Sequence, residues 1–190
     1  MPIVIALVGM PGAQKSKLGK KIVENDTYIE LSNYLAQELL HKNKPLTPGN
    51  YQIIAKELRS KYGPYVLLER AINDISELKE ELVIIDGLRT IDEWKWVKSH
   101  FNNSYLIAIH ASPKTRYNFL LTKSKDFKKN TKSKQPPRTI LECEDLDNAN
   151  LKLGVSTLIS LADYMIINES YSFINPYDQF LKIIEAIKNN

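Results

Sequence analysis

The residues best suited to chemistry directly follow a short apolar stretch near the N-terminus. Residues 3–8 are a run of aliphatic side chains, and the segment GMPGAQKS (9–16) comes next. This is close to the phosphate-binding pattern Gly-x-x-x-x-Gly-Lys-Ser, in which backbone N–H groups at a helix N-terminus surround a phosphate. The lysine of that pattern reaches the terminal phosphates of a nucleotide, and the serine hydroxyl ligates Mg²⁺. The candidate ATP-binding residues are Gly9, Gly12, Ala13, Gln14, Lys15, Ser16 and Lys17.

Gln14 stands where the pattern has its second glycine. The backbone at this point is typically left-handed, which costs a residue other than glycine on the order of 1 kcal/mol or more. The glutamine side chain also adds bulk beside the phosphates. The combination of strand, glycines, Lys-Ser and helix favours a true P-loop over a chance strand–turn–helix, while the survival of nucleotide binding stays open.

Asp86 is the candidate acid of the site. It ends the apolar run 82–85, the position of a Walker B acid. Such an acid orients Mg²⁺ or its water next to the serine of the loop. The sequence therefore predicts a Mg²⁺ site at Ser16 and Asp86. The alternative is that Asp86 only caps the turn that follows it.

Three arginines are further candidates. Arg89 lies just after the acid and is suited to bidentate contact with a substrate phosphate; Arg59 is a second substrate-binding candidate. Arg116 begins a helix from which it can lie over the purine or the phosphates of ATP. For Arg89 and Arg116 the alternative is an ordinary charged surface residue. We predict Lys15, Asp86 and Arg116 as catalytic residues.

Strand-like and helix-like segments alternate along the chain that must position these residues. The predicted strands are 3–8, 28–31, 82–86, 105–110 and 164–168, and a long helix is expected from about Pro137 to Leu161. Thr90–Glu93 reads as a capping box, and Ser112-Pro113 as an N-cap followed by a first-turn proline. The alternation predicts an α/β fold with a five-stranded parallel sheet and helices on both faces. Ligands in such sheets lie at the carboxyl ends of the strands.

The composition is that of one ordinary globular domain. The chain has 190 residues, of which 43% are hydrophobic and 25% charged. A single cysteine, Cys143, excludes an intramolecular disulfide, and the three histidines show no metal-ligand spacing. The apolar start is too short to span a bilayer and lacks a basic leader. We expect a cytoplasmic monomer or homodimer without membrane contact.

A lysine-rich stretch occupies residues 123–134 and accounts for much of the net charge of +4. Its polar composition and the following Pro136-Pro137 predict a mobile lid or loop at about 123–138. A basic run can also follow a nucleic-acid backbone. Because no nucleic-acid-binding module surrounds it, we do not expect nucleic-acid binding.

Six segments together resemble an archaeal family of P-loop proteins related to adenylate and dephospho-coenzyme A kinases. They are GMPGAQKS (9–16), KYGP (61–64), IIDGLRT (84–90), IHASPKTR (109–116), LKLGV (151–155) and LADYMIIN (161–168). The resemblance implies a three-layer P-loop NTPase fold in one domain, 1–190, with an acceptor-binding helical region at about 32–78. It also implies that Asp86 organises Mg²⁺, Arg89 holds the acceptor phosphate and Arg116 contacts ATP.

The chain departs from that family at three places. Gln14 interrupts the loop, and residues 31–34 lack the usual acid and arginine of the acceptor region. Three of the four residues at 144–147 are acids, where the family carries lid arginines. Such arginines offset charge during phosphoryl transfer. The leading hypothesis is ATP-dependent phosphoryl transfer to a small phosphorylated metabolite or nucleotide. The alternatives are a degenerate P-loop binding or regulatory protein that has lost catalysis, and a nucleic-acid-associated protein.

Overall fold

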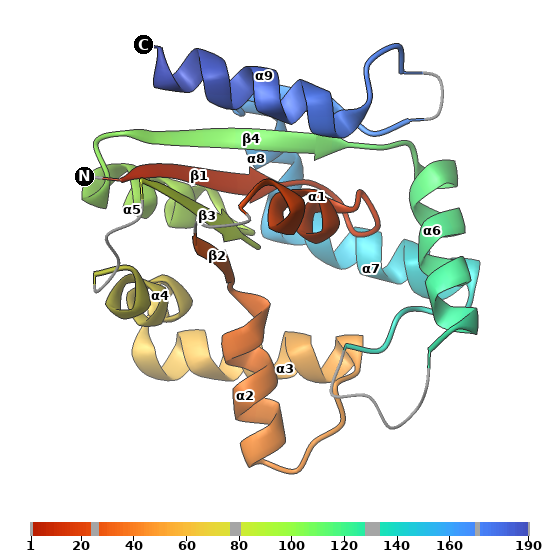
Figure 1. The fold of residues 1–190 in the computed structure, drawn as a ribbon. Coiled ribbons are helices and arrows are strands. Elements are labelled where there is room, and N and C mark those ends of the chain that lie inside the picture. Colours follow the sequence, from red (N-terminus) through yellow and green to blue (C-terminus); the bar gives the residue numbers. More distant parts are fainter. Residues whose placement is uncertain (1, 24–26, 77–80, 128–133, 170–171, 190) are drawn as a thin grey trace.

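A computed structural model describes residues 2–23, 27–76, 81–127, 134–169 and 172–189 (Figure 1). One sheet lies at its centre, with the strand order β2-β3-β1-β4-β5 and every neighbouring pair parallel. The strands are β1 (Ile3–Val8), β2 (Thr27–Glu30), β3 (Leu82–Asp86), β4 (Ser104–His110) and β5 (Tyr164–Ile167). The predicted five-stranded parallel sheet is confirmed, with the P-loop strand β1 in the middle.

The helices connect these strands. They are α1 (Lys15–Ile22), α2 (Ser32–His41), α3 (Pro48–Tyr62), α4 (Val66–Ser76), α5 (Ile91–His100), α6 (Pro113–Lys125), α7 (Ile140–Leu153), α8 (Val155–Ser160) and α9 (Pro176–Lys188). Helices α1 and α9 cover one face of the sheet, while α5 and α8 cover the other (Figure 1).

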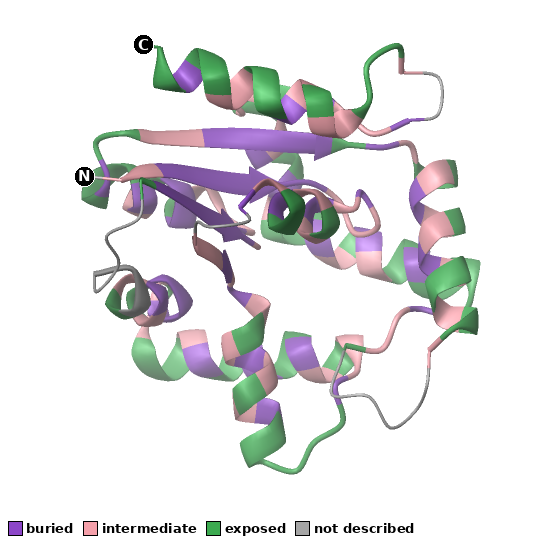
Figure 2. Ribbon diagram, viewed as in Figure 1, coloured by how far each residue is buried: buried purple, intermediate pink, exposed green. Residues whose placement is uncertain are grey.

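The core has two layers because successive residues of a strand point to opposite faces. In β1, Val4 and Ala6 pack with the side chains of α4, α5 and α8, whereas Ile5 and Leu7 pack with those of α1 and α9. The central strands are buried on both faces (Figure 2). This double burial explains why their sequences are continuous apolar runs.

Local capping sets the helix boundaries largely as predicted. The Thr90 hydroxyl accepts a hydrogen bond from the Glu93 N–H while the Glu93 carboxylate accepts one from the Thr90 N–H, so the capping box is formed. The Ser112 hydroxyl likewise accepts from the Thr115 N–H. The long helix expected up to Leu161 is wrong: Gly154, at φ 101, separates α7 from α8. Glycine adopts this left-handed conformation without steric cost and ends a helix there.

Two regions frame the edge of the sheet where the loop lies. Helices α2, α3 and α4 occupy the predicted acceptor region, and α6 continues to Lys125, inside the predicted lid. Residues 128–133 of that lid lie outside the described residues. Beyond them, Gln135 donates its backbone N–H to the Leu46 carbonyl at 2.9 Å, which joins this segment to the α2–α3 connection. Among the described helices, none has the length and apolar character needed to cross a membrane.

Candidate functional site

The loop between β1 and α1 has the backbone that the sequence predicts. Gln14 lies at φ 64 and ψ 27, in the left-handed region. Gly12, at φ 84, is equally constrained, because a Cβ there would come within 2.7 Å of the Arg116 carbonyl oxygen. The Asn168 side-chain amide donates to the Ala13 carbonyl at 3.0 Å. The end of β5 and the start of α6 therefore hold the loop against the sheet.

Lys15 folds back onto its own loop. Its ammonium group donates to the Gly9 carbonyl at 2.8 Å, and the residue is 8% exposed. Burial lowers the pKa of Lys15 to about 8; the nearby Asp86 charge opposes this shift and Arg89 adds to it. Too little negative charge surrounds the buried ammonium group, and a phosphate bound at the loop would supply it.

Ser16 and Asp86 meet, as the sequence predicts. The Ser16 hydroxyl donates to Oδ2 of Asp86 at 2.7 Å, and Asp86 is buried at the carboxyl end of β3. Parallel pairing of β1 with β3 sets Leu7 beside Asp86 and so carries the acid to the loop. A hydroxyl and a carboxylate are the hard oxygen donors that suit Mg²⁺. These residues fit the metal site proposed for them.

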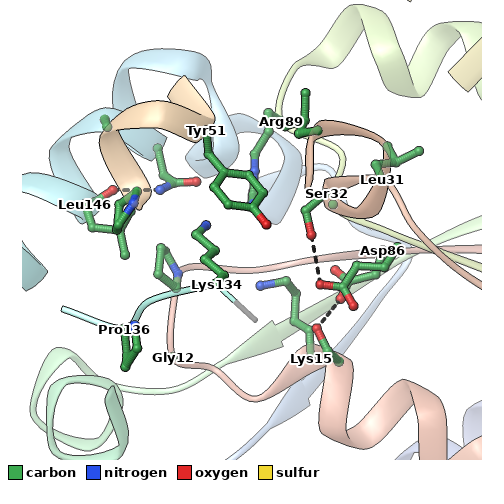
Figure 3. Close-up of a pocket in the computed structure, with 18 of the residues that line it drawn as sticks. Gly12, Lys15, Leu31, Ser32, Tyr51, Asp86, Arg89, Lys134, Pro136 and Leu146 are labelled. Atoms are coloured by element: carbon green, nitrogen blue, oxygen red, sulfur yellow. Dashed lines mark hydrogen bonds between the residues drawn. The ribbon is translucent and has the colours of Figure 1, made fainter. Parts of the chain in front are cut away.

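A cleft of about 340 Å³ opens in front of the loop. Apolar side chains of α2, α6 and α7 line it, among them Leu35, Phe119 and Leu146, and so does a cluster of cations. Besides Lys15, the cationic side chains that line it include Lys17, Arg59, Arg89, Lys123 and Lys134. Figure 3 shows Lys15, Lys134 and Arg89 extending toward the space beside Tyr51. The cleft is therefore built to attract an anion.

Arg89 has unused hydrogen-bonding capacity. Its Nη1 is buried and has no hydrogen-bond partner among the described residues. Burial lowers the pKa of the guanidinium, against the attraction of Asp86 and Glu93. Because an unpaired buried donor costs about 1–3 kcal/mol, a bound phosphate would relieve this cost.

Arg59 is held beside Arg89 by a shared carboxylate. Its Nη2 donates to Oε1 of Glu93 at 2.8 Å, and the Arg89 backbone N–H donates to Oε2 at 2.6 Å. Glu93 is buried and belongs to the capping box of α5. The two substrate-binding candidates thus line one wall, and the capping box that the sequence reveals also fixes their position.

Lys134 is a site residue that the sequence analysis did not single out. It lies in the cleft mouth with its ammonium group 4.9 Å from the centre of the Tyr51 ring. Desolvation by the cleft walls, with repulsion from Arg89 and Lys15, lowers its pKa to about 8. The lysine-rich composition of 123–134 was the available signal, but nothing in it distinguishes this lysine from its neighbours.

Arg116 lies beneath the loop instead of open to the cleft. It is 3% exposed and forms a two-pronged ion pair with Asp147, at 2.7 Å and 2.6 Å. Its guanidinium also donates to the carbonyl oxygens of Ala111 and Pro11. Arg116 therefore clamps the loop to α6 and α7, and its contact with ATP stays a prediction. This pair neutralises Asp147, one of the acids found where the related family carries lid arginines.

Solved structures confirm the fold class. The chain is similar to TT1252 from Thermus thermophilus, with a TM-score of 0.68, 14% identity and 97% of each chain covered. A shikimate kinase from Bacteroides thetaiotaomicron gives a TM-score of 0.59 at 18% identity, covering 98% of each chain. A gluconokinase from Sinorhizobium meliloti gives 0.57 at 14% identity, covering 99% of this chain and 95% of the other. The predicted three-layer fold with a five-stranded parallel sheet is therefore confirmed.

Sequence relatives identify the family. No protein-family model matches the chain. A UPF0200 protein of Methanococcus maripaludis is 33% identical over 193 residues, covering 96% of this chain and 98% of the relative. A UPF0200 protein of Saccharolobus islandicus is 30% identical and covers 97% of this chain and 91% of the relative. With these relatives matched over nearly its whole length, the chain belongs to the UPF0200 family of archaeal proteins.

Proposed function

We propose that this protein is an ATP- and Mg²⁺-dependent phosphotransferase that acts on a small phosphorylated metabolite or nucleotide, in the manner of adenylate kinase or dephospho-coenzyme A kinase. The observation that carries the proposal is the arrangement of one cleft. Lys15, Ser16 and Asp86 line it at the loop, and the cations Arg89 and Lys134 line it as well. A cleft with several cations can hold two anionic groups together, as phosphoryl transfer between two phosphates requires.

One group of residues would bind the phosphate donor and another the phosphate acceptor. Backbone N–H groups at the start of α1 and the Lys15 ammonium would bind the donor phosphates. Ser16 and Asp86 would hold Mg²⁺, which would supply positive charge against the charge that develops during transfer. Arg89, supported by Arg59, would bind the acceptor phosphate through paired N–H groups. The apolar side chains that α6 and α7 contribute to the cleft would exclude water from the reacting groups.

Titration with Mg-ATP tests the donor half of this proposal. Calorimetry should detect one site in the wild type, and Lys15→Ala should abolish it. Turnover is then measured as ADP release with a panel of phosphomonoesters that includes AMP and dephospho-coenzyme A. Binding without turnover on any of them would favour the alternative of a binding or regulatory protein. Failure to bind Mg-ATP would refute the proposal.

Arg89→Met tests the acceptor half. Loss of a charge-assisted hydrogen-bond pair of about 1.5–3 kcal/mol should raise the KM for the acceptor by roughly 10- to 100-fold and leave ATP affinity unchanged. Arg70→Met is the matched control, since Arg70 pairs with Glu38 between α4 and α2 and does not line the cleft. If both variants change the KM for the acceptor equally, Arg89 does not bind the acceptor phosphate.

A further inference from the structure

Tyr28 lies on β2, outside every motif of the sequence analysis, but its hydroxyl reaches the acid of the site. It donates a hydrogen bond of 2.5 Å to Oδ2 of Asp86, and the Ser16 hydroxyl donates one of 2.7 Å to the same oxygen. Asp86 is 3% exposed. Two hydrogen bonds to one oxygen restrict the rotation of the Asp86 carboxylate. Neither of these bonds involves Oδ1.

The helix that follows the loop determines where the Tyr28 ring can lie. A Cβ on Gly19 would come within 2.6 Å of Cε2 of Tyr28 and 2.9 Å of Cδ1 of Leu7. Gly19 is three residues after Ser16, so both lie on the same face of α1. The absence of a side chain at Gly19 lets the ring approach the helix, and the ring carries its hydroxyl to the same oxygen as the serine.

The two hydroxyls have different roles toward a cation. Ser16 can donate its proton to Asp86 and still offer oxygen lone pairs to a metal ion. The Tyr28 hydroxyl binds the carboxylate. Its contact with the acid is the direct bond from its hydroxyl to Oδ2 of Asp86.

We propose that Tyr28 is a positioning residue for metal binding: its hydroxyl holds the Asp86 carboxylate in the orientation that, together with Ser16, accepts Mg²⁺. The inference rests on the proposed function, because it requires a Mg²⁺-bound nucleotide at the loop. Residues that orient a metal-binding group from behind commonly change metal affinity about 10- to 100-fold when removed. Tyr28 belongs to this class through its bond to Asp86.

Tyr28→Phe tests the inference, because it removes the hydroxyl and keeps the ring against Gly19. ADP affinity is measured by calorimetry with Mg²⁺ and again with EDTA, together with the thermal unfolding midpoint. We expect about tenfold weaker binding with Mg²⁺ and unchanged binding with EDTA. A merely structural role would alter both affinities or the unfolding midpoint alone. Tyr164→Phe, at the amino end of β5, is the matched control.

A double-mutant cycle with Asp86→Asn gives a second measurement. If Tyr28 acts through Asp86, its substitution should have no further effect on Mg²⁺ preference in the Asp86→Asn background. A wild type that binds ADP equally with Mg²⁺ and with EDTA would overturn the proposed function and this inference with it. A wild type that prefers Mg²⁺, together with a Tyr28→Phe variant of the same or greater preference, would overturn the inference alone.

Discussion

Replacement of Gln14 by glycine should release strain that the wild-type loop carries. Gln14 lies at φ 64 and ψ 27, where a side chain costs roughly 1–2 kcal/mol relative to the right-handed region. Glycine avoids this cost but gains freedom in the unfolded chain worth about 0.5–1 kcal/mol. We therefore expect Gln14→Gly to raise the free energy of unfolding by about 0.5–1 kcal/mol if the unliganded loop stays left-handed.

The same strain can appear as nucleotide affinity. A strained loop tends to leave the conformation that surrounds phosphate, and the fraction that leaves lowers the apparent affinity. Glycine should then tighten Mg-ATP binding by up to about tenfold, the equivalent of 1.4 kcal/mol. The same strain energy limits both effects. A large gain in the free energy of unfolding therefore implies a small gain in Mg-ATP affinity, and the reverse.

The assay combines Mg-ATP calorimetry with urea unfolding. Gln14→Ala is the control, because it shortens the side chain and keeps the left-handed strain. It therefore separates the effect of side-chain size from the effect of backbone strain. Lys15→Ala in the Gln14→Gly background should abolish the gain in affinity, since it removes the charge that reaches the terminal phosphates.

Two results would refute this reasoning. If Gln14→Gly changes neither affinity nor stability, the strain is absent and another residue limits the site. If Gln14→Ala reproduces the whole gain, side-chain bulk is the cause. Micromolar binding of Mg-ATP by the wild type would show that the glutamine does not weaken the loop seriously.

Three other perturbations have defined outcomes. Asp147→Asn leaves the buried Arg116 charge unpaired and should cost about 3–5 kcal/mol in urea unfolding; wild-type stability in this variant would contradict the clamp. Gly19→Ala places a methyl carbon within 2.6 Å of a ring carbon and should cost about 1–3 kcal/mol and lower the unfolding midpoint, whereas an unchanged midpoint would show that the ring can move away. The pKa values of Lys15 and Lys134 are lowered from 10.5 to about 8, so phosphate affinity should fall as pH rises through about 8. Because the unfolded chain binds more protons than the folded one between these values, stability should rise with pH in that window, and a flat affinity between pH 7 and 9.5 would contradict the shifts.

The sequence predicts those parts of the site that local order determines. The P-loop, the acid at the end of β3 and the parallel sheet follow from short motifs and from the alternation of elements. The left-handed backbone at Gln14 also follows from the motif alone. These features need no knowledge of distant packing, because each is set within a few residues or by one strand order.

The partners of the charged residues follow from tertiary packing instead. Arg116 and Asp147 are 31 residues apart, and Tyr28 and Asp86 are 58 residues apart, so each pair depends on how helices and strands come together. In the sequence alone, the acids at 144–147 suggest repulsion of a bound phosphate. In the structure one of them, Asp147, is buried against Arg116 and neutralises it, and the number of charges in the sequence does not predict this pair.

The bond from the Lys15 ammonium to the Gly9 carbonyl has a kinetic consequence. The carbonyl takes one of the three N–H groups of the ammonium, so the other two can meet an arriving phosphate. The carbonyl also fixes where the ammonium lies, so capture of nucleotide needs no search by a mobile side chain. In stopped-flow traces the observed rate should then rise linearly with nucleotide concentration, and a plateau would show that the lysine must first leave its own loop.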